Sequence, residues 1–222
     1  MKYILAPSIL DADFSCLREV IHNLEKNKIE LIHLDIMDGN FVPNISFGPI
    51  IVKTISDLTS IPLSVHLMIE QPDIHINSFV ESMDENDCLI VHTEASRHLD
   101  RTLQNITEYN IKSGVALNPS TSLESIKYVL DKINTIIIMS VNPGFGGQKF
   151  IPSMISKIIS TREMVIESGR NINIQVDGGI NSENILTVKR AGANILVVGS
   201  EIFKSEYPEK MIKKLQGKLS GN

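Results

Sequence analysis

The sequence predicts an α/β protein folded as a single (β/α)8 TIM barrel over residues 1–222. Short runs rich in Ile, Val and Leu alternate with longer segments of helical period, and eight such pairs in 222 residues give about 28 residues per unit, the size of a βαβ repeat. The short runs are almost continuously apolar, as parallel strands covered on both faces should be. An open doubly wound sheet would alternate in the same way, but eight units without an interrupting linker favour a closed barrel.

The predicted elements follow the chain in a regular order. The expected strands are residues 3–8, 31–36, 63–67, 88–92, 111–117, 135–140, 172–176 and 195–198. Each is followed by a predicted helix, for example residues 14–26, 122–130, 151–167 and 182–191. Capping signals stand ahead of two of these helices, in residues 120–124 (STSLE) and 181–184 (NSEN).

Composition excludes several classes of protein. Hydrophobic residues make up 42% of the chain and charged residues 21%, which is ordinary for a globular protein. A net charge of −5 and the lack of a Lys/Arg-rich run give no reason to expect a nucleic acid partner. The apolar start ends at Pro7 and is too short for a signal peptide, and no segment approaches a membrane span. Cys16 and Cys88 are isolated, so we expect reduced, buried thiols and a cytoplasmic location.

Polar residues gather at the predicted carboxyl ends of strands, where a barrel carries its chemistry. Ser8 ends the first strand, His33 and Asp35 end the second, His66 ends the third and Asp177 ends the seventh. Any one of them could be a satisfied polar residue at a strand end. Together, two imidazoles and two carboxylates are a plausible set of ligands for one divalent transition metal, and two of them could also move protons. The sequence therefore predicts a metal-assisted acid/base enzyme.

Glycines follow the last three predicted strands. They stand in residues 141–147 (VNPGFGG), in Asp177-Gly178-Gly179 and in Gly199-Ser200. Glycine lets the backbone approach a ligand and present N–H groups, and the loops after strands seven and eight are the usual phosphate site of this fold. The same glycines could serve only tight turns. Because few basic residues lie in these loops, a bound phosphate would rely on backbone dipoles.

Three methionines stand at or just beyond strand ends. Met37, Met68 and Met139 lie near the predicted ligands. Methionine is usually core filler, but three at one barrel mouth could instead form a dry lid beside the reacting carbons. Both interpretations remain open from the sequence.

Several segments resemble the ribulose-phosphate 3-epimerase family. The resemblance covers essentially the whole chain in order and spacing, and it is carried by residues 6–10 (APSIL), 33–39 (HLDIMDG), 65–68 (VHLM), 139–148 (MSVNPGFGGQ), 176–180 (VDGGI) and 198–200 (VGS). It implies a (β/α)8 barrel that interconverts D-ribulose 5-phosphate and D-xylulose 5-phosphate in the pentose phosphate pathway. It also implies one divalent metal ion held by His33, Asp35, His66 and Asp177.

The resemblance further implies which residues bind the sugar phosphate. The implied substrate-binding residues are Ser8, His66, Gly144, Phe145, Gly146, Gly147, Asp177, Gly178, Gly179, Gly199 and Ser200. Inverting C3 of a 2-ketose requires removing a proton from one face and returning one to the other, which needs two acid/base groups. We assign Asp35 as the base and Asp177 as the acid in the ribulose-to-xylulose direction. The metal would bind the C2 carbonyl oxygen and the C3 hydroxyl and stabilise a cis-enediolate.

The chain departs from the family pattern at two positions. Ser64 stands where many members carry Asp, two residues before His66, which puts metal affinity and preference in doubt. Thr93 stands where Pro is frequent. We expect the remaining histidines to be structural: His22, His75, His92 and His98.

Other activities remain possible from the sequence. An allulose-6-phosphate 3-epimerase would use the same chemistry on a longer sugar. A ketose-phosphate lyase, such as an aldolase or a decarboxylase, usually needs Lys at a strand end, and no predicted strand ends in Lys. A non-catalytic binding module would not need both carboxylates. An N2O2 ligand set suits Zn²⁺, Fe²⁺, Mn²⁺ or Co²⁺, and a homo-oligomer is the default for a barrel of this type.

Overall fold

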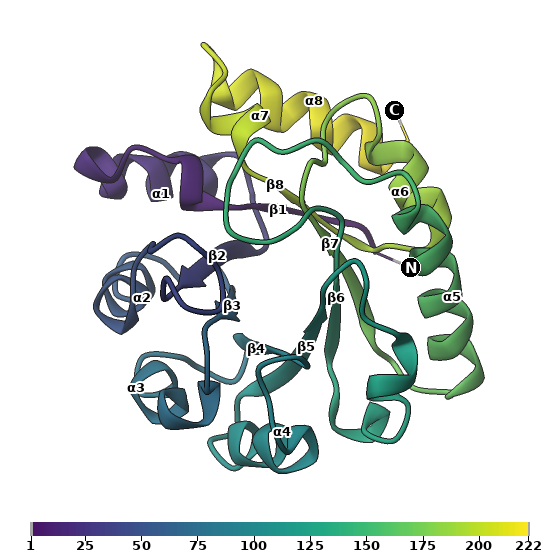
Figure 1. Cartoon of the computed structure of the whole chain (residues 1–222). Coiled ribbons are helices and arrows are strands. Elements are labelled where there is room, and N and C mark those ends of the chain that lie inside the picture. The colour runs from purple at the N-terminus through teal and green to yellow at the C-terminus, as the bar shows by residue number, and fades with distance from the viewer. Residues whose placement is uncertain (1, 222) are drawn as a thin grey trace.

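The computed structural model describes residues 2–221, so Met1 and Asn222 of the predicted domain lie outside the described residues. Eight parallel strands form one sheet in the order β1-β8-β7-β6-β5-β4-β3-β2 (Figure 1). Their bounds are β1 Ile4–Pro7, β2 Ile32–Met37, β3 Leu63–Met68, β4 Cys88–His92, β5 Lys112–Leu117, β6 Thr135–Met139, β7 Asn173–Asp177 and β8 Ile195–Val198. A parallel bridge between Ser8 and His33 joins the two outer strands, β1 and β2, which confirms the predicted barrel.

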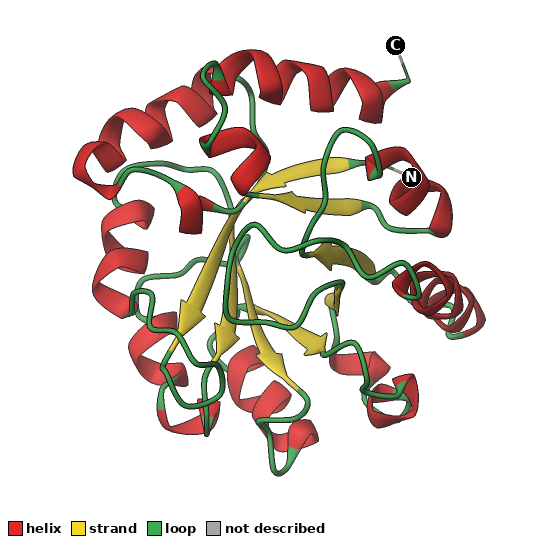
Figure 2. Ribbon diagram, turned by 45° about the horizontal axis from the view of Figure 1, so that its top comes forward, coloured by secondary structure: helices red, strands yellow, loops and turns green. Residues whose placement is uncertain are grey.

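Helices surround the strands on the outside (Figure 2). The α-helices are α1 Leu17–Lys26, α2 Pro49–Ser56, α3 Ile76–Val80, α4 Leu99–Thr107, α5 Met154–Glu167, α6 Ile185–Ala191, α7 Ser200–Phe203 and α8 Pro208–Ser220. Short 3-10 helices cover Ile9–Asp11, Phe14–Cys16, Pro72–Ile74, Leu123–Ile126 and Leu130–Lys132. Among the described residues, no helix has the length and apolar character needed to cross a membrane.

Every predicted strand end lies within one residue of the observed one. The helix predicted at residues 122–130 is wrong, because this segment forms a 3-10 helix over Leu123–Ile126 and a second one begins only at Leu130. Its backbone N–H groups bond to the carbonyl three residues back, as from Ser125 to Ser122 and from Val129 to Ile126. A 3-10 helix rises about 2.0 Å per residue against 1.5 Å in an α-helix, so the short connection from β5 to β6 covers more distance per residue. Ser122 caps the first of these helices by accepting from the Glu124 N–H.

Strand side chains alternate between two cores, as the pleat requires. In β2, Ile32, Leu34 and Ile36 face the helices and belong to the large outer core, whereas His33 and Asp35 face the barrel interior. On the side of β1 and β8 the barrel interior is apolar and filled by Ala6, Ile195 and Val197, with Ile4 and Leu31 packed against them. The polar interior residues that were predicted as ligands come instead from β2, β3 and β7.

The two cysteines are free thiols, as predicted. Cys88 is buried inside the barrel, whereas Cys16 is partly exposed, so the expectation of burial is correct only for Cys88. Cys16 ends the 3-10 helix Phe14–Cys16, in which no residue is buried.

Candidate active site

Two histidines and two aspartates meet at the carboxyl end of the barrel. His33 and Asp35 come from β2, His66 from β3 and Asp177 from β7, and one ligand atom from each lies within 4.8 Å of the other three. All four residues are buried. The parallel register sets Asp35 beside His66, and closure of the barrel brings β7 within reach of both. The convergence predicted from the strand ends is therefore observed.

The spacing of the donor atoms fits one tetrahedral metal ion. His33 Nε2 lies 3.2 Å from Asp35 Oδ1 and 3.6 Å from Asp177 Oδ2, and His66 Nδ1 lies 3.3 Å and 3.7 Å from the same two oxygens. Ligands about 2.0–2.1 Å from a tetrahedral Zn²⁺ are separated from one another by about 3.3–3.4 Å. The four residues could thus hold a divalent ion with little movement of their side chains.

The electrostatics of the cluster also favour a cation. Burial opposes protonation of His33, but the Asp35 and Asp177 carboxylates outweigh it and raise the pKa of His33 to about 10. Burial opposes ionisation of Asp35, but His33 and His66 outweigh it and hold the pKa of Asp35 well below its usual range. In the metal-free cluster, a proton on His33 therefore supplies the positive charge that two buried carboxylates need. A divalent ion would take over that role.

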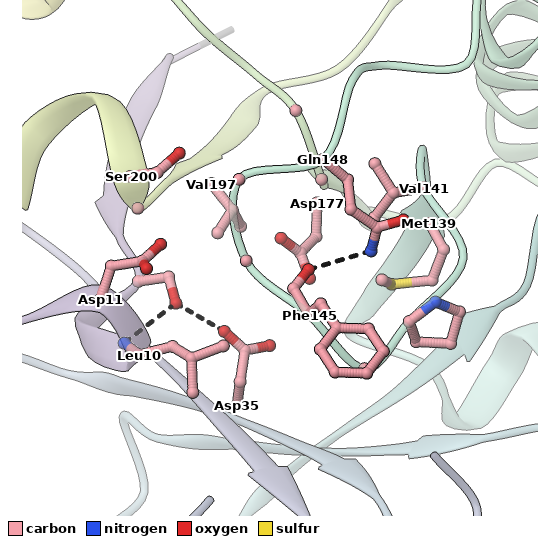
Figure 3. Close-up of a pocket in the computed structure, with 18 of the residues that line it drawn as sticks. Leu10, Asp11, Asp35, Met139, Val141, Phe145, Gln148, Asp177, Val197 and Ser200 are labelled. Atoms are coloured by element: carbon pink, nitrogen blue, oxygen red, sulfur yellow. Dashed lines mark hydrogen bonds between the residues drawn. The ribbon is translucent and has the colours of Figure 1, made fainter. Parts of the chain in front are cut away.

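Ser8 holds one of the carboxylates in place. Its hydroxyl donates a hydrogen bond of 2.5 Å to Asp35 Oδ2 and accepts one of 3.4 Å from the Leu10 N–H (Figure 3). Oδ1 of Asp35, the other oxygen, faces the two histidines. Ser8 thus fixes the orientation of Asp35 and leaves Oδ1 toward the ligand cluster.

Two uncharged side chains contact Nδ1 of His33, the ring nitrogen that does not face the aspartates. Gln175 Nε2 lies 2.9 Å from His33 Nδ1, and Ser64 Oγ lies 3.2 Å from the same nitrogen. The Ser64 hydroxyl also donates to Gln175 Oε1 at 3.2 Å. Ser64 therefore contacts the candidate ligand His33. Gln175 was not among the predicted site residues, although it is two residues before Asp177 and so faces the same side of β7.

A second pair backs His66. His66 Nε2 lies 2.9 Å from His92 Nε2, and His92 Nδ1 lies 3.0 Å from Glu94 Oε2. Burial lowers the pKa of His92 to about 4. Burial opposes ionisation of Glu94, but hydrogen bonds from His92, Thr121 and Asn118 outweigh it and lower the pKa of Glu94 to about 2. His92, expected to be only structural, therefore touches a candidate ligand.

One pocket opens above the cluster. Among the predicted residues, its lining includes Ser8, Asp35, Met37, Met68, Met139, Gly144, Phe145, Gly146, Gly147, Asp177, Gly178, Gly179, Gly199 and Ser200. Leu10, Asp11, Gln148 and Ile180 also line it and were not predicted. His33 and His66 have no exposed surface and are not in the lining, so they lie beneath the pocket. The carboxyl groups of Asp35 and Asp177 enter the same space from different strands (Figure 3).

The three methionines are buried in the pocket wall. Met37 and Met68 pack with Val42, Leu10 and Phe41, and Met139 belongs to a separate apolar cluster inside the barrel. They serve as core and pocket lining at once, and a role as a lid stays a prediction.

The glycine loops pack tightly against one another. Gly179 has a φ of +66°, and a Cβ atom there would lie 2.4 Å from the Phe150 backbone nitrogen. Close approach between the loops after β6 and β7 therefore requires Gly179. By contrast, a Cβ at Gly146 would meet the Asp11 carboxyl, the end of a side chain. Turn geometry thus explains Gly179 without a ligand, whereas at Gly146 it is the Asp11 side chain that leaves no room for a Cβ.

A salt bridge stands beside these loops. Lys204 Nζ lies 2.8 Å from Asp11 Oδ1, and Lys204 also approaches Gly147, with Nζ 3.7 Å from the Cβ that a side chain there would carry. The sequence-based expectation of few basic groups near the loops overlooked Lys204, because it lies on the far side of the short helix α7. Its position five residues after Gly199 could have indicated a basic group near the loops.

The fold and the site together define a (β/α)8 barrel with a buried, metal-compatible His/Asp cluster below a glycine-lined pocket. The model of the ribulose-phosphate 3 epimerase family matches residues 4–203. The chain is 47% identical to the ribulose-phosphate 3-epimerase of Bacillus subtilis over 96% of this chain and 98% of that protein. The Escherichia coli K12 enzyme of the same name is 40% identical over 99% and 97% of the two chains. The chain belongs to the ribulose-phosphate 3-epimerase family, whose members are isomerases.

Solved structures show the same barrel at low sequence identity. A 3-hexulose-6-phosphate synthase superposes with a TM-score of 0.69 at 15% identity, covering 98% of this chain and 99% of that one. KGPDC from Streptococcus mutans superposes with a TM-score of 0.68 at 12% identity, covering 100% and 99%. These likenesses support the fold alone, and the family assignment comes from the closer relatives.

Proposed function

We propose that this chain epimerises C3 of D-ribulose 5-phosphate to give D-xylulose 5-phosphate, the reaction of its family in the pentose phosphate pathway. The observation that carries the proposal is the meeting of two buried carboxylates, Asp35 and Asp177, in a pocket shared with three glycine loops. Two acid/base groups from different strands suit an inversion, and a glycine-lined wall suits a phosphate.

In the proposed mechanism, the ionised Asp35 carboxylate removes the proton from C3 of ribulose 5-phosphate. The electron pair of the broken C–H bond forms a C2–C3 double bond, and negative charge moves to the C2 oxygen. A protonated Asp177 then donates its proton to the other face of C3, which restores the ketone with inverted configuration. In the reverse direction the two residues exchange roles.

The local environment of Asp35 supports its role as the base. His33 and His66 favour its ionised form, and the Ser8 hydroxyl donates to its Oδ2 atom. Because Ser8 lines the pocket, it is also placed to contact the sugar. The contact between His66 and substrate stays a prediction, since His66 has no exposed surface.

His33, Asp35, His66 and Asp177 would hold one divalent metal ion, Zn²⁺, Fe²⁺, Mn²⁺ or Co²⁺. When bound, the ion would supply positive charge beside the substrate oxygens on which negative charge develops. We further propose that the glycine loops bind the phosphate through backbone N–H groups. A homo-oligomeric state and a cytoplasmic location stay predictions.

Proton NMR of ribulose 5-phosphate in D₂O tests the proposal. With protein reconstituted separately with each of the four metals, xylulose 5-phosphate should form with deuterium at C3, and a chelator should abolish its formation. Folded protein that produces neither xylulose 5-phosphate nor exchange at C3 with any of these metals would refute the proposed reaction. Activity that survives complete removal of metal would refute the metal requirement alone.

A further inference from the structure

A continuous row of three side chains, His66, His92 and Glu94, leads from the ligand cluster to the surface. His66 Nδ1 faces Asp35 and Asp177, and His66 Nε2 faces His92 Nε2 at 2.9 Å. His92 Nδ1 in turn faces Glu94 Oε2 at 3.0 Å. The two imidazole side chains have no exposed surface, whereas the Glu94 side chain is 24% exposed. The proposed mechanism assigns no task to His92 or Glu94.

The hydrogen bonds of Glu94, at the outer end of this row of side chains, determine which oxygen is left for His92. Glu94 Oε1 accepts from the Asn118 N–H at 2.8 Å and from the Thr121 hydroxyl. Glu94 Oε2 is therefore left for His92. An ionised carboxylate has no proton to donate, so His92 must carry its proton on Nδ1 and give it to Glu94.

The position of one proton determines the next. With its proton on Nδ1, a neutral His92 has a bare Nε2 atom, which can only accept. Without a metal ion, a proton on His66 Nδ1 can face Asp35 Oδ1 at 3.3 Å. When a metal ion takes the place of that proton, His66 must carry its proton on Nε2 and donate it to His92, which leaves Nδ1 bare for the ion. A metal ion binds only a bare ring nitrogen, so this arrangement is the one that a ligand requires.

We propose that His92 and Glu94 are positioning residues that fix the tautomer of His66 and so prepare its Nδ1 atom for a metal ion. This inference rests on the metal site of the proposed function. His33 has no carboxylate on its Nδ1 side, where it meets only the uncharged Gln175 amide nitrogen and Ser64 hydroxyl. Of the two candidate histidine ligands, His66 is the one whose row of contacts ends at a carboxylate, that of Glu94.

Replacing the carboxylate with an amide of the same shape gives a sharp test. In Glu94→Gln, the carbonyl oxygen remains the acceptor for Asn118 and Thr121, so the amide NH₂ group faces His92. His92 Nδ1 must then accept, His92 Nε2 carries the proton, and His66 Nε2 must accept it. The His66 proton must then stay on Nδ1, where it blocks the ligand position. We expect Zn²⁺ binding to weaken about 10- to 100-fold, the usual effect of losing an outer partner of a metal ligand.

Two variants provide matched controls. Thr121→Val removes one hydrogen bond to Glu94 but keeps the carboxylate. It therefore tests whether Glu94 acts by holding its loop in place or by setting the position of the His92 proton. If Glu94 only braces the loop, this variant should weaken Zn²⁺ binding, whereas Glu94→Gln, which keeps both hydrogen bonds to its carbonyl oxygen, should not. Ser64→Ala changes the surroundings of His33 and should leave the His66 signals unchanged.

The experiment combines chelator competition for Zn²⁺ with long-range ¹H–¹⁵N NMR of histidine-labelled protein, with and without Zn²⁺. We expect wild type and Thr121→Val to show His92 protonated on Nδ1, to show His66 protonated on Nε2 once Zn²⁺ is bound, and to bind Zn²⁺ with similar affinity. Glu94→Gln should move the His92 proton to Nε2 and weaken binding. Unchanged tautomers and affinity in Glu94→Gln, or equal losses in both variants, would overturn the inference. Wild type that binds no Zn²⁺ would instead refute the proposed metal site, and the NMR spectra would still decide the tautomer question.

Discussion

The mouth of the barrel has two halves that are built differently. The side-chain half consists of residues within β2, β3 and β7 and one residue just beyond β1: His33, Asp35, His66, Asp177 and Ser8. The loop half consists of residues 144–147, 178–179 and 199–200, which follow β6, β7 and β8, are mostly glycine and line the pocket, with the Phe145 and Ser200 side chains among them (Figure 3). The first half can move protons and hold a cation, whereas the second can only bind. We therefore expect substitutions in the side-chain half to lower kcat and substitutions in the loop half to raise KM.

The largest effect should come from the two carboxyl groups. Asp35→Asn and Asp177→Asn each remove one acid/base group and one charged metal ligand, and we expect kcat to fall by about 10³-fold or more. The affinity for inorganic phosphate, a probe of the loop half, should stay within about twofold, because no loop residue changes. Steady-state kinetics and phosphate inhibition measure the two quantities. Near-normal kcat in either variant would remove that residue from the mechanism.

Metal affinity should depend on pH, whereas substrate binding by the loop half should not. With its pKa raised to about 10, His33 is protonated in the metal-free protein at neutral pH and must lose that proton before it can bind a metal ion. Zn²⁺ affinity should therefore rise by about tenfold per pH unit from about pH 6.5 to 7.5, with release of one proton. Calorimetry in buffers of different ionisation enthalpy measures the release. Affinity that is flat across this range would show that His33 is already neutral.

Ser8→Ala should have a smaller effect, confined to the side-chain half. The substitution removes the hydrogen bond to ionised Asp35, and a bond to a charged group is worth about 1.5–3 kcal/mol. We expect kcat/KM to fall by about tenfold or more, since the ionised base loses a stabilising donor. The pH profile of kcat/KM should show its acidic limb shifted to higher pH. An unchanged profile would mean that Ser8 does not act through Asp35.

The smallest effects should come from the loop half. Lys204→Met removes a cation beside Gly147, and Asp11→Asn removes an anion from the pocket lining, so KM should rise in the first variant and fall in the second. We expect changes of about two- to fivefold, because Lys204 is well exposed and water screens its charge. Gly146→Ala, which places a methyl group beside Asp11, should also raise KM.

Gly217→Ala is the matched control for these loop variants, because a Cβ there has open space around it on α8. It should leave kcat and KM unchanged. Changes in kcat rather than KM for the loop variants would mean that the two halves do not divide binding from chemistry.

The same division explains what the sequence could predict. His33, Asp35, His66 and Asp177 were predictable because each stands at the end of an apolar run, and parallel strands bring such ends together. The helix at residues 122–130 was not, because its periodicity does not distinguish an α-helix from two 3-10 helices.

Contacts across the barrel were beyond the reach of sequence patterns. Gln175 meets His33 from a strand 142 residues away, and Glu94 is found only by following His92 behind His66. Lys204 and Asp11 lie far apart in the chain and meet only when α7 folds beside the first 3-10 helix. Residue type and period predict which side chains reach the mouth, and the fold alone determines which of them touch.

Deuterium exchange by the two carboxyl variants tests the central claim most directly. Each variant, with its metal content verified, is incubated in D₂O with ribulose 5-phosphate and, separately, with xylulose 5-phosphate. We predict that Asp177→Asn, which keeps Asp35, introduces deuterium at C3 of ribulose 5-phosphate without forming the epimer. Asp35→Asn should do the same only to xylulose 5-phosphate. Exchange of both sugars by either variant, or the reverse pairing, would contradict the assignment of Asp35 and Asp177 to opposite faces of the sugar.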